Sequence, residues 1–206
     1  VLNMPFSEEI PTLTPVGITR WKGEEWITQR ALDTANFTVE KDALTLCGNG
    51  LDLCDRKMQG LLLVRQQERA FTAETALEIP AAGTAGLTCY YDEHSYLKFG
   101  IGPEGLLLEE YAGYEVVSRQ TAPLPASTSH VRLRVTAADG QRHFAIQDRT
   151  DWHTLWSIPE PRYLTSEGLQ CGKRFTGAMV GLYVHGASAV RFADWVAVWP
   201  HPEEKR

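Results

Sequence analysis

Two segments of this chain alternate strictly between apolar and polar residues. In Phe71–Ile79 the odd-numbered positions carry Phe, Ala, Thr, Leu and Ile, while the even-numbered positions carry Thr, Glu, Ala and Glu. The segment His130–Thr136 repeats the pattern, with Val, Leu and Val separated by His, Arg, Arg and Thr. Successive side chains of a β-strand point to opposite faces of its sheet, so this period predicts strands with one buried and one solvated face. The chain is therefore expected to be a β protein.

Turn residues separate the candidate strands at short intervals. The dipeptide Asp139-Gly140 is a hairpin signal between His130–Thr136 and Arg142–Gln147. No segment shows the period of a long helix. Short strands at regular spacing predict an all-β fold, a two-sheet antiparallel β-sandwich. The other expected strands cover residues 43–46, 60–64, 86–91, 96–101, 106–110, 115–119, 178–185 and 189–199.

Composition limits the classes of partner. The chain has 206 residues, of which 43% are hydrophobic and 22% are charged, so it can bury a sizeable core. Its formal charge of -6 argues against nucleic acid and against an anionic membrane, because both select clustered Lys and Arg. The apolar runs are far shorter than the roughly 20 residues of a membrane span. We expect no nucleic-acid partner and no membrane partner.

The chain is expected to form one domain with two short flanking segments. Residues 1–20 contain three prolines and are interpreted as an N-terminal arm or linker. The sandwich is expected over residues 21–200, and residues 201–206 form a polar tail. The N-terminus lacks the basic and apolar regions of a signal peptide, which favours a cytoplasmic location.

The four cysteines lack the spacing of a zinc site and are too sparse for a disulfide scaffold. They are interpreted as free thiols, which also fits a cytoplasmic location. The turn sequence between Cys47 and Cys54 leaves one disulfide open as an alternative.

No arrangement of carboxylates indicates catalysis. Sandwich glycosidases of the laminarinase type place Glu-x-Asp-x-Glu on one strand, and this chain has no such triplet. The nearest acidic groups are Glu109 with Glu110, on opposite faces of a strand, and Asp148 with Asp151 in a turn; we interpret both pairs as solvated surface. The nucleophile-elbow, zinc-protease and phosphate-loop motifs are also absent. No catalytic residue is assigned.

Aromatic side chains are the best candidates for ligand binding, because an exposed ring can stack on the ring of a ligand. The candidates are Tyr90, Tyr91, Trp152, Trp156 and Tyr163. Trp152 and Trp156 are expected to share one strand face, and one of the two adjacent tyrosines is expected at the surface. Core packing is the alternative for all of them.

Asp194 is the candidate metal ligand. Alternation along Val190–Val198 places it on the same face as Phe192 and Val196, and a carboxylate on an apolar face needs a partner. A structural Ca²⁺ held with backbone carbonyls is one interpretation. A buried arginine partner and a strand-end cap are the alternatives.

Three segments in order carry a family resemblance. They are Arg65–Leu77 with its Phe-Thr-Ala-Glu-Thr stretch, Gly86–Asp92 with Gly-Leu-Thr-Cys-Tyr-Tyr-Asp, and Phe175–Leu182 with Phe-Thr-Gly-Ala-Met-Val-Gly-Leu. Together they resemble the C-terminal β-sandwich domain of the β-xylosidases of glycoside hydrolase family 43, over about residues 21–199. The resemblance implies a jelly roll of the concanavalin A or laminin G type, and a role in carbohydrate metabolism and xylan degradation.

The resemblance implies an accessory role. In those enzymes hydrolysis belongs to a separate N-terminal propeller, whose acid and base carboxyls lie about 6.5–9.5 Å apart. A propeller and a sandwich do not fit into 206 residues, so no catalytic carboxylate is carried over. The implied role is to pack on the propeller and to help shape a pocket for xylo-oligosaccharides. Phe175 matches an aromatic side chain at the mouth of that pocket, with core packing as the alternative.

A second interpretation stays open, namely a free-standing carbohydrate-binding or protein-interaction module. The implied partners are the catalytic propeller and a xylo-oligosaccharide or other carbohydrate. A homo-oligomer is a further alternative. No cofactor is implied beyond the calcium ion considered at Asp194.

Overall fold

The computed structural model describes residues 20–28, 34–124, 129–172 and 177–200. Within these ranges the only helices are two 3₁₀ turns, η1 (Thr34–Asn36) and η2 (Arg162–Leu164). Neither turn is long enough to cross a bilayer. All longer elements are β-strands, which confirms the all-β prediction.

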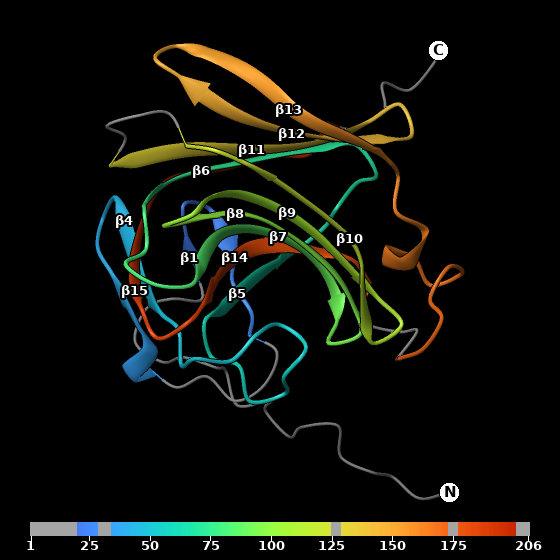
Figure 1. Ribbon diagram of the computed structural model, residues 1–206, viewed down its shortest axis with the longest axis horizontal. Coiled ribbons are helices and arrows are strands. Elements are labelled where there is room, and N and C mark those ends of the chain that lie inside the picture. The colour runs from blue at the N-terminus through green and yellow to red at the C-terminus, as the bar shows by residue number, and fades with distance from the viewer. Residues whose placement is uncertain (1–19, 29–33, 125–128, 173–176, 201–206) are drawn as a thin grey trace, which may run out of the picture.

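Two antiparallel sheets stack face to face (Figure 1). The first contains β5 (Leu61–Arg65), β7 (Thr84–Asp92), β8 (Ser95–Gly102), β9 (Gly105–Ala112), β10 (Glu115–Ala122) and β14 (Met179–His185). The second contains β3 (Phe37–Val39), β4 (Ala43–Cys47), β6 (Phe71–Glu78), β11 (His130–Ala138), β12 (Gln141–Asp148), β13 (Asp151–Pro159) and β15 (Ala189–Val198). A small hairpin of β1 (Arg20–Trp21) and β2 (Glu24–Glu25) lies at the N-terminal side.

The last two strands lie in the interior of the sheets, each between two earlier strands. The six-stranded order is β10-β9-β8-β7-β14-β5, and the seven-stranded order is β13-β12-β11-β6-β15-β4-β3. Strand β14 therefore separates β5 from β7, and β15 separates β4 from β6. This topology confirms the expected sandwich of the concanavalin A type.

The core lies between the two sheets. Strand β6 alternates between buried and part-exposed residues along most of its length, as its sequence predicts. Its inward residues Phe71 and Leu77 join Leu133 of β11 and Phe99 of β8, each 1% exposed or less. Strands β7 and β8 are buried at almost every position instead. Both faces of the six-stranded sheet are therefore covered at β7 and β8.

All four cysteines are free. Cys89 is fully buried, and burial raises the pKa of its thiol. Cys47 and Cys54, the pair for which a disulfide stayed open, are not bridged.

Candidate functional site

The outer face of the six-stranded sheet is covered by the loop that joins β4 to β5. Leu53 and Met58 of this loop are buried in an apolar cluster separate from the core between the sheets. Under the loop, the ring of Tyr96 stacks between Tyr90 at 6.0 Å and Tyr111 at 4.7 Å, measured between centroids. This face is a second packed layer.

The expectation that Tyr90 or Tyr91 lies at the surface is wrong. The two side chains belong to different clusters, Tyr91 to the core between the sheets and Tyr90 to the cluster under the loop. Each is 1% exposed, because both faces of β7 are covered. A sugar ring has no access to either of them in this fold.

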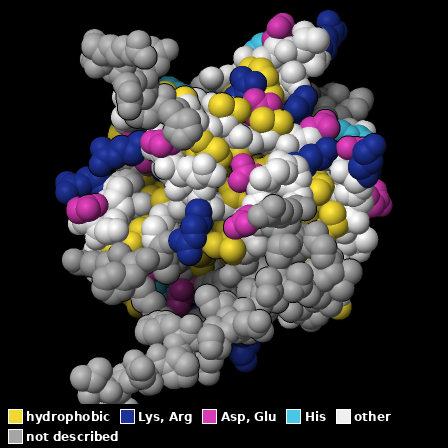
Figure 2. Space-filling view, turned by 180° about the vertical axis from the view of Figure 1, so that it is seen from behind, with side chains coloured by type: hydrophobic (Ala, Val, Ile, Leu, Met, Phe, Trp, Pro, Cys, Tyr) yellow, Lys and Arg dark blue, Asp and Glu magenta, His cyan; other side chains and the backbone are white. Residues whose placement is uncertain are grey.

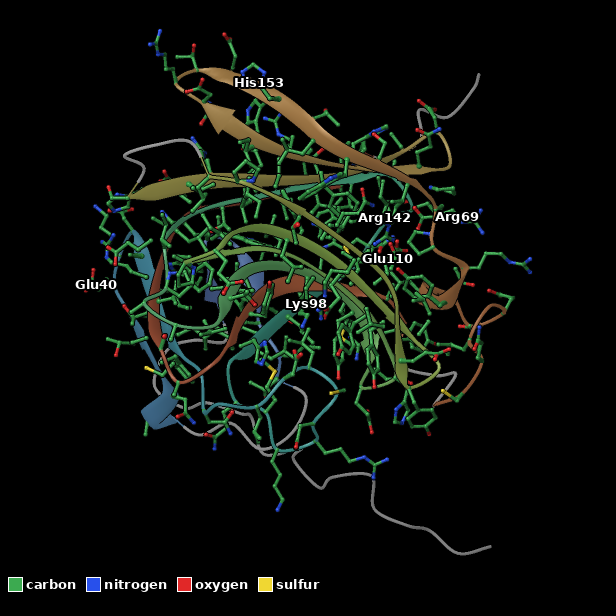
Figure 3. The ribbon with its side chains drawn as sticks, in the orientation of Figure 1. Glu40, Arg69, Lys98, Glu110, Arg142 and His153 are labelled. Atoms are coloured by element: carbon green, nitrogen blue, oxygen red, sulfur yellow. The ribbon has the colours of Figure 1, made fainter. Side chains whose placement is uncertain are left out.

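Four charged side chains cross the same outer face. Lys98 is 2% exposed, and its ammonium group lies 2.8 Å from Asp52 and 2.6 Å from Glu109 (Figure 3). The guanidinium group of Arg119 donates to Glu109 as well. Burial of Asp52 opposes its ionisation, but the charge and hydrogen bonds of Lys98, the charge of His185 and the backbone N–H of Leu53 together outweigh burial and lower the pKa of the Asp52 carboxyl. Asp52 thereby fastens the covering loop to the sheet.

The interpretation of Glu109 as a solvated group is wrong, since its side chain is 2% exposed. Glu110 accepts a hydrogen bond from the hydroxyl of Tyr163 at 2.8 Å. Asp148 and Asp151 are exposed beside the turn between β12 and β13, as expected. Asp52 and Glu109 share one ammonium group, which is the arrangement of a structural ion pair, whereas a general acid and base need carboxyls that reach a substrate.

One row of paired residues marks an end of the six-stranded sheet. From edge to edge the partners are Arg65, Met179, Tyr90, Tyr96, Tyr111 and Val116. The turn between β9 and β10 follows Tyr111, and the turn between β7 and β8 follows Tyr90. We call this side of the molecule the turn end.

Exposed apolar groups gather at one edge of the turn end. Tyr114 is 63% exposed and packs on His94, with ring centroids 4.1 Å apart. Val116 and Val117 of the edge strand β10 are 44% and 50% exposed. We call Tyr114, Val116 and Val117 the apolar edge. Apolar side chains also lie between charged ones of both signs on the face that Figure 2 shows.

Phe175 lies outside the described residues, but its neighbours in the chain are placed at the turn end. Gly172 packs so tightly against the Asp92 carboxylate that an added Cβ would collide with it. On the other side, Ala178 accepts a hydrogen bond from the backbone N–H of Gln66 at 3.1 Å. A hollow of about 670 Å³ lies close by, lined by Gly23, Glu24, Glu25, Ile27, Arg65 and Gln67.

Trp152 and Trp156 do not share a strand face, contrary to expectation. The pairing of β12 with β13 shifts register between Phe144 and Ala145, so Trp156 lies opposite Phe144. Trp152 lies opposite Gln147. Phe144 and Gln147 have opposite phases on β12, so this β-bulge turns one tryptophan inward and the other outward.

The two tryptophans therefore have different surroundings. Trp156 packs against the core, with its ring edge-on to Phe99 at 6.1 Å. Trp152 is half-buried on the outer face of the seven-stranded sheet, where the guanidinium carbon of Arg134 lies 3.7 Å from its ring centroid. Only Trp152 keeps a position suited to a sugar ring.

The expectation that Asp194 shares the apolar face of β15 is also wrong. Asp194 has a φ of 53°, and the pairing of β15 with β6 shifts register between Ala193 and Val196. This bulge resets the alternation, so that Trp195 is buried while Asp194 is exposed. In the described ranges no three His, Cys, Asp or Glu side chains gather as metal ligands. Calcium binding at Asp194 stays a prediction.

Sequence reasoning missed the buried arginine of the core. Arg142 is 1% exposed, and its Nη2 lies 2.6 Å from Glu160 (Figure 3). Its guanidinium carbon lies 5.4 Å from the ring centroid of Phe71. The signal was present, because Arg142 has the same phase in β12 as the inward Phe144.

Comparisons with known proteins agree with this fold. The family model described as "Beta xylosidase C-terminal Concanavalin A-like domain" matches residues 22–196. A β-xylosidase of Bacillus subtilis (strain 168) is 27% identical over an alignment of 169 residues, and the match covers 74% of this chain and 32% of that protein. The structure of a xylan β-1,4-xylosidase from Bacillus halodurans C-125 has a TM-score of 0.71 at 20% identity and covers 84% of this chain and 36% of that one. The chain thus spans about a third of these relatives.

For a further solved structure, the match covers nearly the whole of the other chain. A functionally unknown protein from Saccharomyces cerevisiae has a TM-score of 0.59 at 17% identity, covering 87% of this chain and 97% of that one. The likeness is one of fold alone. It shows that the fold also occurs as nearly all of a crystallised chain.

Proposed function

Because the chain belongs to the family of β-xylosidase C-terminal concanavalin A-like domains, we propose that it is the accessory sandwich of a glycoside hydrolase. In this role it packs on a catalytic propeller and helps to shape a pocket for xylo-oligosaccharides. Catalytic carboxylates are supplied by the propeller.

The observation that carries the proposal is the composition of the turn end. A domain that covers another needs an apolar surface that is left open when it stands alone. The apolar edge provides such a surface, and the hollow beside Arg65 lies at the other edge of the same residue row. Gly172 and Ala178, the described residues on either side of Phe175 in the sequence, lie at the same end of the sheet.

Phe175 is proposed to reach the mouth of the pocket. The segment that contains it is bounded by Gly172 with a φ of 96° and Gly177 with a φ of 73°. Backbone in this left-handed region favours glycine, so the chain can change direction sharply at both boundaries. Gly172 lies close against Asp92, and the Ala178 carbonyl accepts a hydrogen bond from the backbone N–H of Gln66, so the described residues on both sides have defined positions.

The test joins the chain to a catalytic propeller of the family and compares it with that propeller alone. We expect the joined enzyme to have the higher kcat/KM for xylobiose. Replacing Tyr114 and Val117 together with Asp should remove the gain, because buried carboxylates disrupt an apolar contact. The melting temperature of the 206-residue chain should stay unchanged, since both side chains are exposed. Equal activity with and without the sandwich would sink the proposal.

A free-standing binding module is the second candidate. It is favoured by the yeast structure, in which this fold makes up nearly the whole chain. The discriminating observation is the full reading frame, because a propeller encoded upstream supports the accessory role.

A further inference from the structure

The outer face of the seven-stranded sheet carries a second group of aromatic and charged side chains. The turn end belongs to the other sheet. Arg134 of β11 lies opposite Glu74 of β6, and its Nε and Nη2 lie 2.8 and 2.6 Å from the Glu74 carboxylate. The same guanidinium group covers one side of the Trp152 ring. Glu74 thus fixes Arg134, and Arg134 fixes Trp152, in one preorganised platform.

Small residues give this platform its flat base. Ala145 lies opposite Arg134, and although it belongs to the outer face it is only 5% exposed. The next row contains Ala76 opposite Arg132 and Ala193 opposite Ala76. Because these side chains are short, the Trp152 ring and the guanidinium groups project further from the sheet than their neighbours do.

The charges of the platform are unequal. Arg132 also lies near Glu74, with its Nη2 at 3.7 Å, so two guanidinium groups share one carboxylate. The Nε of Arg132 is buried and has no hydrogen-bond partner among the described residues. Glu74, Arg132 and Arg134 together keep one positive charge, whereas Glu78 on the same face pairs with His130, and the Arg132 side chain is 33% exposed.

Arg132 and Trp152 are aligned across the sheet. Trp152 lies opposite Gln147, and the register of Leu133 with Ile146 continues to place Gln147 opposite Arg132. The two side chains are thus two strands apart, about 10 Å at ordinary strand spacing. An aromatic ring and a carboxylate-binding group stand at a separation that one branched sugar can bridge.

We propose that this face binds an acidic carbohydrate, of the class of xylo-oligosaccharides that carry a uronic acid branch. A sugar ring stacks on Trp152, and the carboxylate of the branch accepts hydrogen bonds from Arg132. The choice of xylose-based chains rests on the proposed function. The carboxylate preference rests on the geometry alone.

The test measures binding of two probes to the 206-residue chain by calorimetry. One probe is a xylo-oligosaccharide with a single glucuronic acid branch, and the other is the unbranched chain of equal length. We expect the acidic probe to bind about tenfold tighter, and this preference to shrink as salt rises. Trp152→Ala should weaken binding of the acidic probe about tenfold. Arg132→Ala should remove the preference between the probes, and Arg132→Lys should restore part of it.

His153→Ala is the matched control, because His153 neighbours Trp152, is exposed and has the opposite strand phase. It should leave both affinities unchanged. Trp152→Tyr keeps an aromatic ring and should retain part of the binding, which separates loss of stacking from loss of folding. Absence of binding, or binding that Trp152→Ala and Arg132→Ala leave unaltered, overturns this proposal. Neither result affects the test of the proposed function, which measures the activity of the chain joined to a propeller.

Discussion

The Lys98 ammonium group lies 2.6 Å from the Glu109 carboxylate, and both side chains are 2% exposed. A buried charge is tolerable only while its partner is present. Lys98→Met should therefore destabilise the chain by about 3–5 kcal/mol, because it removes the cation that Glu109 and Asp52 share. Urea denaturation measures this change. Lys22→Met is the control, because its partner Asp42 is 72% exposed and such a surface pair contributes about 1 kcal/mol or less. Equal effects of the two variants would contradict this account of the ion pair.

The attachment of the covering loop should depend on pH through Asp52. Its pKa is lowered from an ordinary value of 3.8, so the folded state holds the ionised carboxyl more tightly than the unfolded state does. The resulting stability is present above that value and is lost as pH falls through the lower pKa of the folded state. The stability difference between the native chain and Asp52→Asn should shrink as the pH falls below about 4. A difference independent of pH would be incompatible with the Lys98 pairing.

The chain alone should not hydrolyse aryl β-xylosides or aryl α-arabinosides. The paired carboxylates of the outer face are bound to Lys98 and Arg119, and none is assigned a catalytic role. The measurement is release of the aryl group by a highly purified sample. Turnover above the uncatalysed rate that disappears when an Asp or Glu of this chain is replaced would overturn the accessory role.

Phe175→Ala separates the two roles considered for this side chain. If Phe175 reaches the pocket, the variant should leave the melting temperature of the chain nearly unchanged and reduce turnover once a propeller is joined. A core phenylalanine would instead cost about 3–5 kcal/mol. Thermal melting and xylobiose hydrolysis on the same variant decide between them.

A calcium ion at Asp194 predicts a melting temperature that falls when a chelator is added, because a ligand of the folded state stabilises it by mass action. Asp194→Ala should abolish that difference. Identical melting curves with and without chelator would contradict calcium binding at Asp194 and leave it only a role in the β-bulge.

Local alternation predicted the strands where nothing interrupts it. Strands β6 and β11 bury the residues that their sequences indicate, because neither strand contains an inserted residue; the extra residue in the pairing of β6 with β15 lies in β15. The resemblance of three short segments to a known family predicted the type of sandwich, that of concanavalin A. Arg142 was missed although its phase in β12 pointed inward, since arginine is rarely expected in a core.

The failures have two physical causes. In β13 and β15 a bulge inserts a residue and reverses the phase, which separated Trp152 from Trp156 and moved Asp194 to the surface. Asp194 tolerates its positive φ better than most residues do, but this preference is too weak to predict a β-bulge from the sequence. The second cause is non-local, since the burial of Tyr90 depends on a loop some forty residues earlier in the chain.

The interior positions of β14 and β15, each between two earlier strands, have a consequence for biosynthesis. Until residues 179–198 leave the ribosome, β5 has no neighbour to join it to β7, and β4 has none to join it to β6. Pairings this distant in sequence close large loops and form slowly. Any domain encoded ahead of this one would therefore be folded first, and the sandwich would close against a finished surface.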